Sequence, residues 1–223
     1  MDFLFLSKTL LFRGTSPREI ETMLGCLHAE QKGYKKSDVI YHAGDRVTSL
    51  GMVLSGGVSI ESDDFWGNKN ILDHVGPGQV FAETYACVPG EALMVNVVAS
   101  EPTNILFLDT GHLIQICSNA CEHHSKLIGN LLLISAQKNL NLSRRIFHTS
   151  SKSIRGRLLS YLSDQAIRKG SRDFTIPFNR QQLADYLSVD RSALSNELSK
   201  MNREGLISVD RNHFLLLEMA ETF

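Results

Sequence analysis

The 223-residue sequence is long enough for one large domain or two smaller domains, each with its own hydrophobic core. Its 43% hydrophobic and 21% charged residues are ordinary for a soluble globular protein. No apolar run reaches the ~18–20 residues that cross a bilayer, and the start lacks the basic region and cleavage site of a signal peptide. We therefore expect a cytoplasmic protein without membrane contact.

Charge is distributed unevenly along the chain. Residues 1–142 carry 10 Lys or Arg against 15 Asp or Glu, whereas residues 143–223 carry 13 against 9. The first part is therefore acidic and the second basic, within an overall net charge of −1. A basic surplus favours phosphate binding, although chance segregation of charges is the alternative.

In chain order, the first predicted element is a helix from about Ser16 to His28, with Ser16 as its cap and Pro17 at its first position. Short β-prone runs separated by turn residues follow between Gly33 and Asp109. We expect strands at 38–41, 50–54, 58–61, 70–74, 94–99 and 105–109. Short strands at this spacing predict a sandwich or a barrel.

A long helical pattern without proline then spans residues 119–148. Along it, a seam of residues at alternating three- and four-residue steps consists of Ile128, Leu131, Ser135, Lys138 and Leu142. This spacing suits packing against a partner helix. Two of the five seam positions are polar, which weakens that interpretation, and an ordinary buried helix is the alternative.

The C-terminal part of the sequence predicts two short helices joined by a tight turn. Asn179 can cap a helix that begins at Arg180, and Ser188-Val189-Asp190 forms the turn. Asp190 then caps a second helix whose apolar residues face inward. The outer positions of that second helix are mostly short and polar: Arg191, Ser192, Ser195, Asn196 and Ser199.

The neighbouring elements complete a recognisable order. A preceding amphipathic helix carries on its apolar face Ile154, Leu158, Leu159 and Leu162. A strand at 174–177 and a hairpin formed by 207–209 and 213–217 flank the two short helices. This order predicts a winged helix, whose second helix can enter a major groove ~12 Å wide. The alternative is a pair of helices in an all-α protein that binds no nucleic acid.

Several of these segments resemble the CRP/FNR family of bacterial regulators. The stretch Arg180–Ser195 and the following Glu204-Gly205-Leu206-Ile207 resemble the family's helix-turn-helix, and Leu50–Ile60 and Val75–Phe81 resemble its cyclic-nucleotide-binding β-roll. The resemblance covers nearly the whole chain. It implies an α+β fold with three parts: a double-stranded β-helix (jelly roll) with flanking helices in 1–118, a dimerisation helix in 119–148 and a winged helix-turn-helix in 149–223.

The resemblance also implies partners for the chain. Family members are homodimers that bind two-fold symmetric sites in double-stranded DNA, so residues 119–148 are expected to form the dimer contact. RNA polymerase is a further candidate partner. The charged loop Arg168–Arg172 is one candidate for that contact, although a solvated loop is the alternative.

By the same resemblance, the DNA-contacting residues are Arg180, Gln181, Asp190, Arg191, Ser192, Ser195, Asn196 and Lys200. Within this set, Arg191, Ser192 and Asn196 occupy the family's base-reading positions, and Arg180 and Gln181 match positions that hold phosphates. Ser192 and Asn196 replace the Glu and Arg of the best-known members. The half-sites of those members therefore cannot be assumed for this chain.

The sensor pocket departs from the family pattern. The family's Gly-Glu-Leu turn reads Phe81-Ala82-Glu83-Thr84 here, and the Arg-Ser pair that holds the cyclic phosphate reads Leu93-Met94. Glu83 is retained, but a lone glutamate is more often a surface residue. The positions that would face the purine read Lys138-Asn139. Because the phosphate-binding Arg is absent, we expect an apolar or uncharged small effector of unknown identity in place of cyclic AMP.

The alternative within the same family is a regulator that responds to a metal, to haem or to redox state. Iron–sulfur sensing in this family needs four thiolates, several near the N-terminus, and only Cys26 lies there, so no cluster is expected. Cys117, Cys121 and His124 have helical spacing, which makes Cys121 and His124 the metal candidates. Packing residues near the long helix are the competing interpretation of this group.

Two further classes of function are considered. A metabolite-binding β-roll protein could use its C-terminal unit for protein contacts, but the basic surplus and the polar helix face argue against this. A cupin-like enzyme would need a histidine-rich metal site, and only His42 and His74 lie in the β-rich region. With no nucleophile–base pair or metal triad in the sequence, no enzymatic activity is expected.

Overall fold

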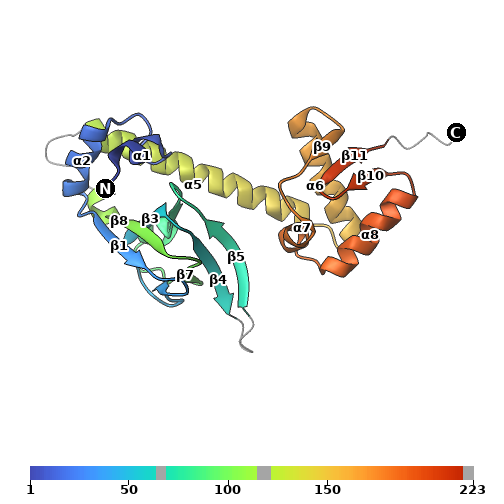
Figure 1. The fold of residues 1–223 in the computed structure, drawn as a ribbon, viewed down its shortest axis with the longest axis horizontal. Helices are drawn as coiled ribbons and strands as arrows, with labels where there is room; N and C mark the ends of the chain where they lie inside the picture. The colour runs from blue at the N-terminus through green and yellow to red at the C-terminus, as the bar shows by residue number, and fades with distance from the viewer. Residues whose placement is uncertain (64–68, 115–121, 218–223) are drawn as a thin grey trace. The chain divides into compact units, whose positions relative to one another are not determined.

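The computed structural model describes residues 1–63, 69–114 and 122–217 (Figure 1). The chain divides into two compact units, Met1–Gln137 and Lys138–Phe223. The division falls inside the long helix α5 (Glu122–Thr149), so the last turns of that helix belong to the C-terminal unit. None of the helices in the described part of the chain has the length and apolar composition needed to cross a membrane.

The N-terminal unit is built on two four-stranded antiparallel sheets, which form the predicted β-roll (Figure 1). The first sheet contains, in spatial order, β1 (Glu30–Tyr34), β8 (Thr103–Asp109), β3 (Ser49–Ser55) and β6 (Val80–Phe81). The second contains β2 (Val39–Tyr41), β7 (Asn96–Ala99), β4 (Val58–Asp63) and β5 (Lys69–Val75). The six expected strands are present, with β7 beginning two residues later than expected, and β1 and β6 are additional.

Aromatic side chains fill much of the interior of the roll. The rings of Tyr41, Phe81 and Phe107 meet edge to face, with centroids 5.8–6.4 Å apart. The Cζ end of the Phe81 ring also lies against Gly51 on β3, where an added Cβ would come within 2.2 Å of Cζ. The close approach of β6 to β3 therefore depends on the absence of a side chain at position 51.

Four short helices accompany the roll: α1 (Phe3–Lys8), α2 (Pro17–Cys26), α3 (Glu83–Cys87) and α4 (Thr110–Ile114). The expected cap of α2 is present, because the Ser16 hydroxyl and the Glu19 carboxylate each accept a backbone N–H from the other residue. The helix α1 was not predicted. Its Leu6 is fully buried in the core between the helices and the first sheet.

The first half of α5 completes that same core. Leu127, Leu131 and Ile134 are buried there, and the Asn130 amide donates hydrogen bonds of 2.9 and 2.8 Å to the carbonyls of Leu11 and Arg13. The expectation that Leu131 belongs to a seam facing a partner helix is therefore wrong. Its side chain packs within its own chain because α1 and α2 cover that side of α5.

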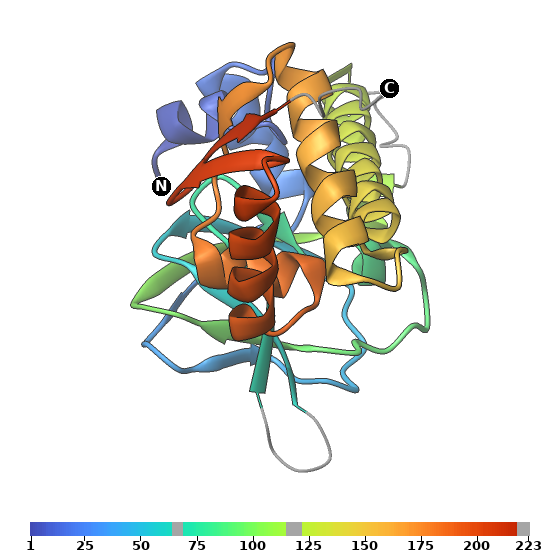
Figure 2. The same cartoon turned by 90° about the vertical axis from the view of Figure 1, so that its right-hand side faces the viewer.

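The C-terminal unit has the predicted winged-helix order. Its elements after α5 are α6 (Ile154–Lys169), β9 (Asp173–Thr175), α7 (Arg180–Leu187), α8 (Arg191–Arg203), β10 (Ile207–Asp210) and β11 (His213–Leu216). The strands form one antiparallel sheet in the order β10-β11-β9. Figure 2 shows the β10–β11 hairpin at one end of α8. Leu158 and Leu162 of α6 are buried as expected, whereas Leu159 is partly exposed.

The contact between Gly51 and Phe81 gives a stability prediction. Gly51→Ala is expected to lower the free energy of unfolding of the N-terminal unit by about 1–3 kcal/mol, because the buried ring must move to admit a methyl group. Urea denaturation followed by circular dichroism measures this. Gly25→Ala in α2, where a Cβ meets nothing within 4 Å, is the control and should not destabilise the unit. An unchanged midpoint for Gly51→Ala would contradict the packing described here.

Candidate DNA-reading surface and effector pocket

The turn between α7 and α8 is fixed by local hydrogen bonds. Asn179 caps α7 by accepting from the Gln182 N–H at 2.9 Å, and the Gln182 side chain accepts from the Asn179 N–H at 2.8 Å. Ser188 ends the helix in the left-handed region, with φ of 53°. Asp190 then caps α8 by accepting from the Ala193 N–H at 2.9 Å. The structure thus contains the expected three-residue turn.

The helix α8 separates an apolar face from a polar face. Leu194, Leu198 and Met201 are buried in the core of the unit. The opposite face carries the predicted DNA-contacting positions of this helix, which are exposed except for the partly exposed Ser195: Arg191, Ser192, Ser195, Asn196 and Lys200. The structure therefore brings these five positions together on one helix.

The hydroxyl groups on this face are already engaged. The Ser192 hydroxyl donates to the Asp190 carboxylate, and this bond lowers the pKa of Asp190. Ser195 donates to the Arg191 carbonyl at 2.9 Å, four residues back along the helix. Within the described residues, Arg191, Asn196 and Lys200 make no side-chain hydrogen bond or ion pair. Their donors are the ones available to an external partner.

Arg180 and Gln181 lie at the start of α7 and make internal contacts. Arg180 is partly buried, which lowers the pKa of its guanidinium, and its Nη2 donates to the Arg211 carbonyl at 3.1 Å. That carbonyl belongs to the turn between β10 and β11, so Arg180 ties α7 to the hairpin. The Gln181 amide donates to Asp185 at 2.8 Å. A phosphate-holding role for Arg180 and Gln181 stays a prediction.

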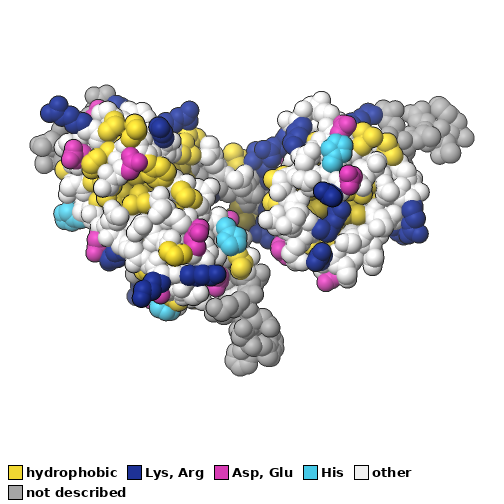
Figure 3. Space-filling model, in the orientation of Figure 1, with side chains coloured by type: hydrophobic (Ala, Val, Ile, Leu, Met, Phe, Trp, Pro, Cys, Tyr) yellow, Lys and Arg dark blue, Asp and Glu magenta, His cyan; other side chains and the backbone are white. Residues whose placement is uncertain are grey.

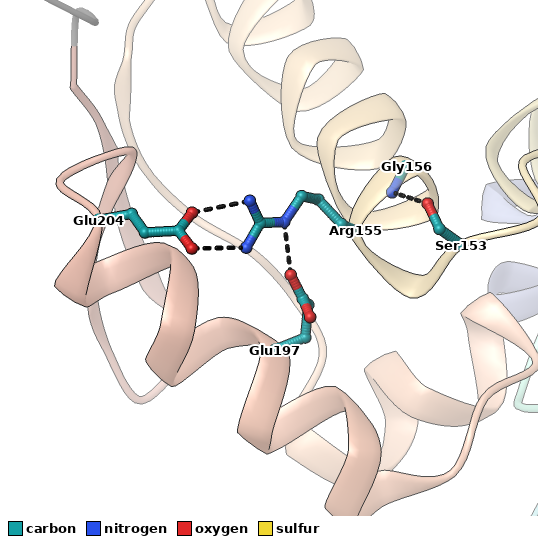
Figure 4. Close-up of polar contacts among 5 residues, drawn as sticks. All are labelled: Ser153, Arg155, Gly156, Glu197 and Glu204. Atoms are coloured by element: carbon teal, nitrogen blue, oxygen red, sulfur yellow. Dashed lines mark hydrogen bonds and ion pairs between the residues drawn. The ribbon is translucent and has the colours of Figure 1, made fainter.

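An ion-pair network that the sequence did not suggest joins α6 to α8 (Figure 4). Arg155 on α6 donates through Nη1 and Nη2 to both carboxylate oxygens of Glu204, at 2.7 and 3.1 Å, and through Nε to Glu197. The bidentate geometry fixes direction as well as distance, and it lowers the pKa of Glu204. The network anchors the middle and the end of α8 on α6.

The predicted effector residues fall in two different places. In the N-terminal unit, Phe81 and Leu93 are buried, Ala82 adopts the left-handed φ of 59°, and Thr84 is exposed. Met94 is 78% exposed although it follows the buried Leu93. Lys138 and Asn139 are exposed residues of α5 that belong to the C-terminal unit. The shared role of all eight residues in an effector pocket stays a prediction.

Glu83 differs from the expectation of a surface residue. It is only 4% exposed, at the start of α3; the burial of the nearby Cys87 thiol raises the pKa of that thiol, and the Glu83 carboxylate raises it further. A buried carboxylate is costly unless it has partners, so its retention inside the roll indicates a structural or ligand-binding role. The sequence pattern alone gave no sign of this burial.

The side chains of the metal candidates lie outside the part of the chain that the structure describes. These candidates are Cys121 and His124, and Cys117 also lies outside the described part. Cys26 is exposed and Cys87 is half-buried, with the raised pKa of an unreactive thiol. Across the described ranges, no group of three or more His, Cys, Asp or Glu side chains could hold a metal ion.

Family models match both units. A cyclic-nucleotide-binding domain model matches residues 31–120, and a Crp-like helix-turn-helix domain model matches residues 156–221. The "Electron transport regulator A" of Shewanella oneidensis is 22% identical over 202 residues, covering 86% of this chain and 76% of the relative. The "Cyclic AMP receptor protein" of Thermus thermophilus is 25% identical over 204 residues, covering 88% of this chain and 87% of the relative.

Solved structures share the fold. CprK in complex with OCPA superposes with a TM-score of 0.64 at 16% identity, covering 89% of this chain and 91% of CprK. The c-di-GMP responsive global regulator CLP of Xanthomonas campestris gives a TM-score of 0.59 at 18% identity, covering 90% and 98%. The chain thus has a β-roll, a long helix and a helix-turn-helix in this order, and the two family models match its two ends. This protein belongs to the CRP/FNR family of transcription regulators.

Proposed function

We propose that this regulator acts as a homodimer that reads two-fold symmetric DNA sites through α8, and that it answers to an uncharged or apolar small effector. The observation that carries the DNA-reading proposal is the free side chains of Arg191, Asn196 and Lys200 on one exposed helix face. The proposed activity is binding, with no catalytic step. It deepens the family assignment by naming the groups that read bases and the chemistry of the effector.

The available donors favour particular bases. An Arg side chain matches the two acceptors on the major-groove edge of guanine, and an Asn side chain matches the acceptor and donor of adenine. Arg191 and Asn196 are therefore proposed to read a guanine and an adenine in each half-site. Ser192 offers no comparable contact, because its hydroxyl proton already bonds Asp190.

The interior of the roll argues against a cyclic phosphate as ligand. Among the buried residues of the described part of the chain there is no Lys or Arg, and the buried Glu83 adds negative charge. A phosphate placed there would lose its hydration without gaining a cation, which is unfavourable. The Thermus relative is named a cyclic AMP receptor, but the Leu93-Met94 positions of this chain supply no positive charge.

The exposed face of α5 supports the dimer. Four exposed apolar side chains recur along it at spacings typical of a helix–helix contact: Ile128, Leu132, Leu142 and Ile146. The most exposed of the four is Leu132, with 70% of its surface accessible to solvent. Large exposed apolar side chains repeated on one helix mark a surface that a partner covers, and a second copy of the same helix would bury both stripes at once.

DNA binding is tested by measuring affinity for selected and random duplexes as a function of salt. Asn196→Ala should cost about 1–3 kcal/mol of discrimination at one base position and leave the salt dependence unchanged. Lys200→Ala should weaken binding to all sequences and reduce the slope of log K against log salt by about 1. Absence of binding to random duplex DNA even at low salt would contradict the proposal.

The dimer is tested by sedimentation velocity at micromolar concentration. Leu132→Glu and Leu142→Glu should shift the protein towards monomer, because each places a charge in an apolar contact. Ile167→Glu is the matched control, since Ile167 is 81% exposed but belongs to α6 and not to α5, and it should leave the dimer intact. A wild-type protein that sediments as a monomer would refute the dimer.

The effector chemistry is tested with cyclic AMP as the probe. Isothermal titration calorimetry of the full chain should detect no binding at cyclic AMP concentrations that would saturate a typical cyclic AMP receptor. The variant Leu93→Arg places a cation at the family's phosphate position and should not by itself create tight binding, because the Ser partner is also absent. Tight cyclic AMP binding by the wild-type protein would overturn this part of the proposal.

A further inference from the structure

The C-terminal end of α7 is capped by two arginines from other helices. The last carbonyls of any α-helix lack partners within the helix. Arg145 on α5 donates through Nε to the Tyr186 carbonyl at 3.1 Å and through Nη2 to the Asp185 carbonyl at 3.0 Å. Arg157 on α6 donates through Nη1 to the carbonyls of Leu187 and Ser188, at 3.0 and 2.9 Å. Two positive charges therefore lie at the negative end of the α7 dipole.

Helix α5 contacts the ring and the hydroxyl of Tyr186 as well as its carbonyl. The Arg145 guanidinium lies 5.8 Å from the centre of the Tyr186 ring, within range of a cation–π contact. The Tyr186 hydroxyl lies 2.9 Å from Nδ1 of His148, which is buried one turn further along α5. The rings of Tyr161 and Phe178 pack against Tyr186, with centroids 5.4 and 5.0 Å away. The carbonyl, ring and hydroxyl of one residue are thus all engaged by α5.

We propose that Arg145 and His148 are positioning residues for DNA binding, which fix α7 to the end of α5 and thereby set the orientation of α8. The proposal rests on the proposed reading of DNA by α8. Because the turn after Leu187 is fixed by the Asp190 cap and by Arg157, α7 and α8 move as one piece. The contacts of Arg145 and His148 connect this piece to α5, whose first half is embedded in the N-terminal core.

The surroundings of His148 determine how the contact responds to acid. The ring is faced by Arg144 on its own helix, by Tyr161, Asp164 and Arg168 on α6, and by Tyr186 on α7. Burial lowers the pKa of His148, as do Arg144 and Arg168, and these effects outweigh the attraction of Asp164, whose Oδ2 lies 3.6 Å from Nε2. The ring is therefore neutral in the folded protein at neutral pH.

The sign of the pH dependence follows from this shift. The pKa of His148 is lower in the folded state than the value of about 6.5 expected in the unfolded chain. Its contribution to stability is therefore fully present above about pH 6.5 and is lost as the pH falls through the folded-state pKa. Protonation in acid would place a positive charge on the buried His148 ring near Arg144 and Arg168. This charge would weaken the contact between His148 and the Tyr186 hydroxyl.

The test uses the full-length chain and two duplexes of about 30 base pairs, one selected from a random pool by the wild-type protein and one of random sequence. Arg145→Ala should lower affinity for the selected duplex by about tenfold and leave random-duplex affinity and its salt slope unchanged. Arg144→Ala, measured at pH 7.5, is the control for charge: it removes the same charge one residue away, and although Arg144 lowers the pKa of His148, its side chain hydrogen-bonds Asn141 on its own helix and not α7. It should keep both affinities.

Hydrogen exchange and pH supply two readouts that distinguish positioning from loss of folding. Amides of α7 should exchange faster in Arg145→Ala than in Arg144→Ala, with the rest of the unit unchanged. Affinity for the selected duplex should fall as the pH is lowered below about 6.5 in the wild type, and less so in His148→Gln, which keeps a hydrogen-bonding group but cannot become charged. If Arg145→Ala does not fold, Arg145→Lys, which cannot bridge both carbonyls, replaces it.

Each other outcome has a defined meaning. An equal loss on both duplexes with a smaller salt slope would make Arg145 a phosphate contact and overturn the proposal. Identical behaviour of Arg145→Ala and Arg144→Ala would also overturn it. An equal acid response of the wild type and His148→Gln would remove His148 from it. A wild-type protein that binds neither duplex would instead refute the proposed function.

Discussion

Helix α5 is one continuous helix whose side chains pack in both compact units. Its first half buries Leu127, Leu131 and Ile134 in the N-terminal core. Its last turns place Arg145 and His148 against α7, where Arg145 donates to the last carbonyls of that helix and His148 contacts the Tyr186 hydroxyl. A break in α5 would therefore disturb the packing of one unit or the other.

The two units use different chemistry for their tasks. The DNA-reading unit forms polar contacts through the caps of α7 and α8 and the Arg155 network, and it presents the unbonded donors of Arg191, Asn196 and Lys200 on the exposed face of α8. The roll instead has an aromatic interior around Phe81 and Phe107, with one buried carboxylate, Glu83. A protein built this way reads a polyanion with one domain and, as proposed, an uncharged molecule with the other.

Much of the fold could be predicted because its signals are local. Asn179, Asp190 and Ser16 are helix caps at the expected positions, and strands such as β3 are rich in apolar residues. The strand β1, with the sequence Glu-Gln-Lys-Gly-Tyr, lacks such a pattern and is a strand because it pairs with β8. The contacts of Arg155 and Arg145 join residues some 40 or more positions apart, so no local pattern could reveal them. The burial of Glu83 was hidden for the same reason.

In the proposed dimer, each α8 reads one half of a symmetric DNA site. Selection of bound duplexes from a random DNA pool, followed by sequencing, tests whether it does. The account predicts an enriched site with two-fold symmetry, whose half-site centres lie about 10 base pairs apart and each contain a guanine and an adenine that Arg191→Ala and Asn196→Ala respectively cease to select. A pool that shows no enriched motif, or a motif without symmetry that both variants still select, would contradict it.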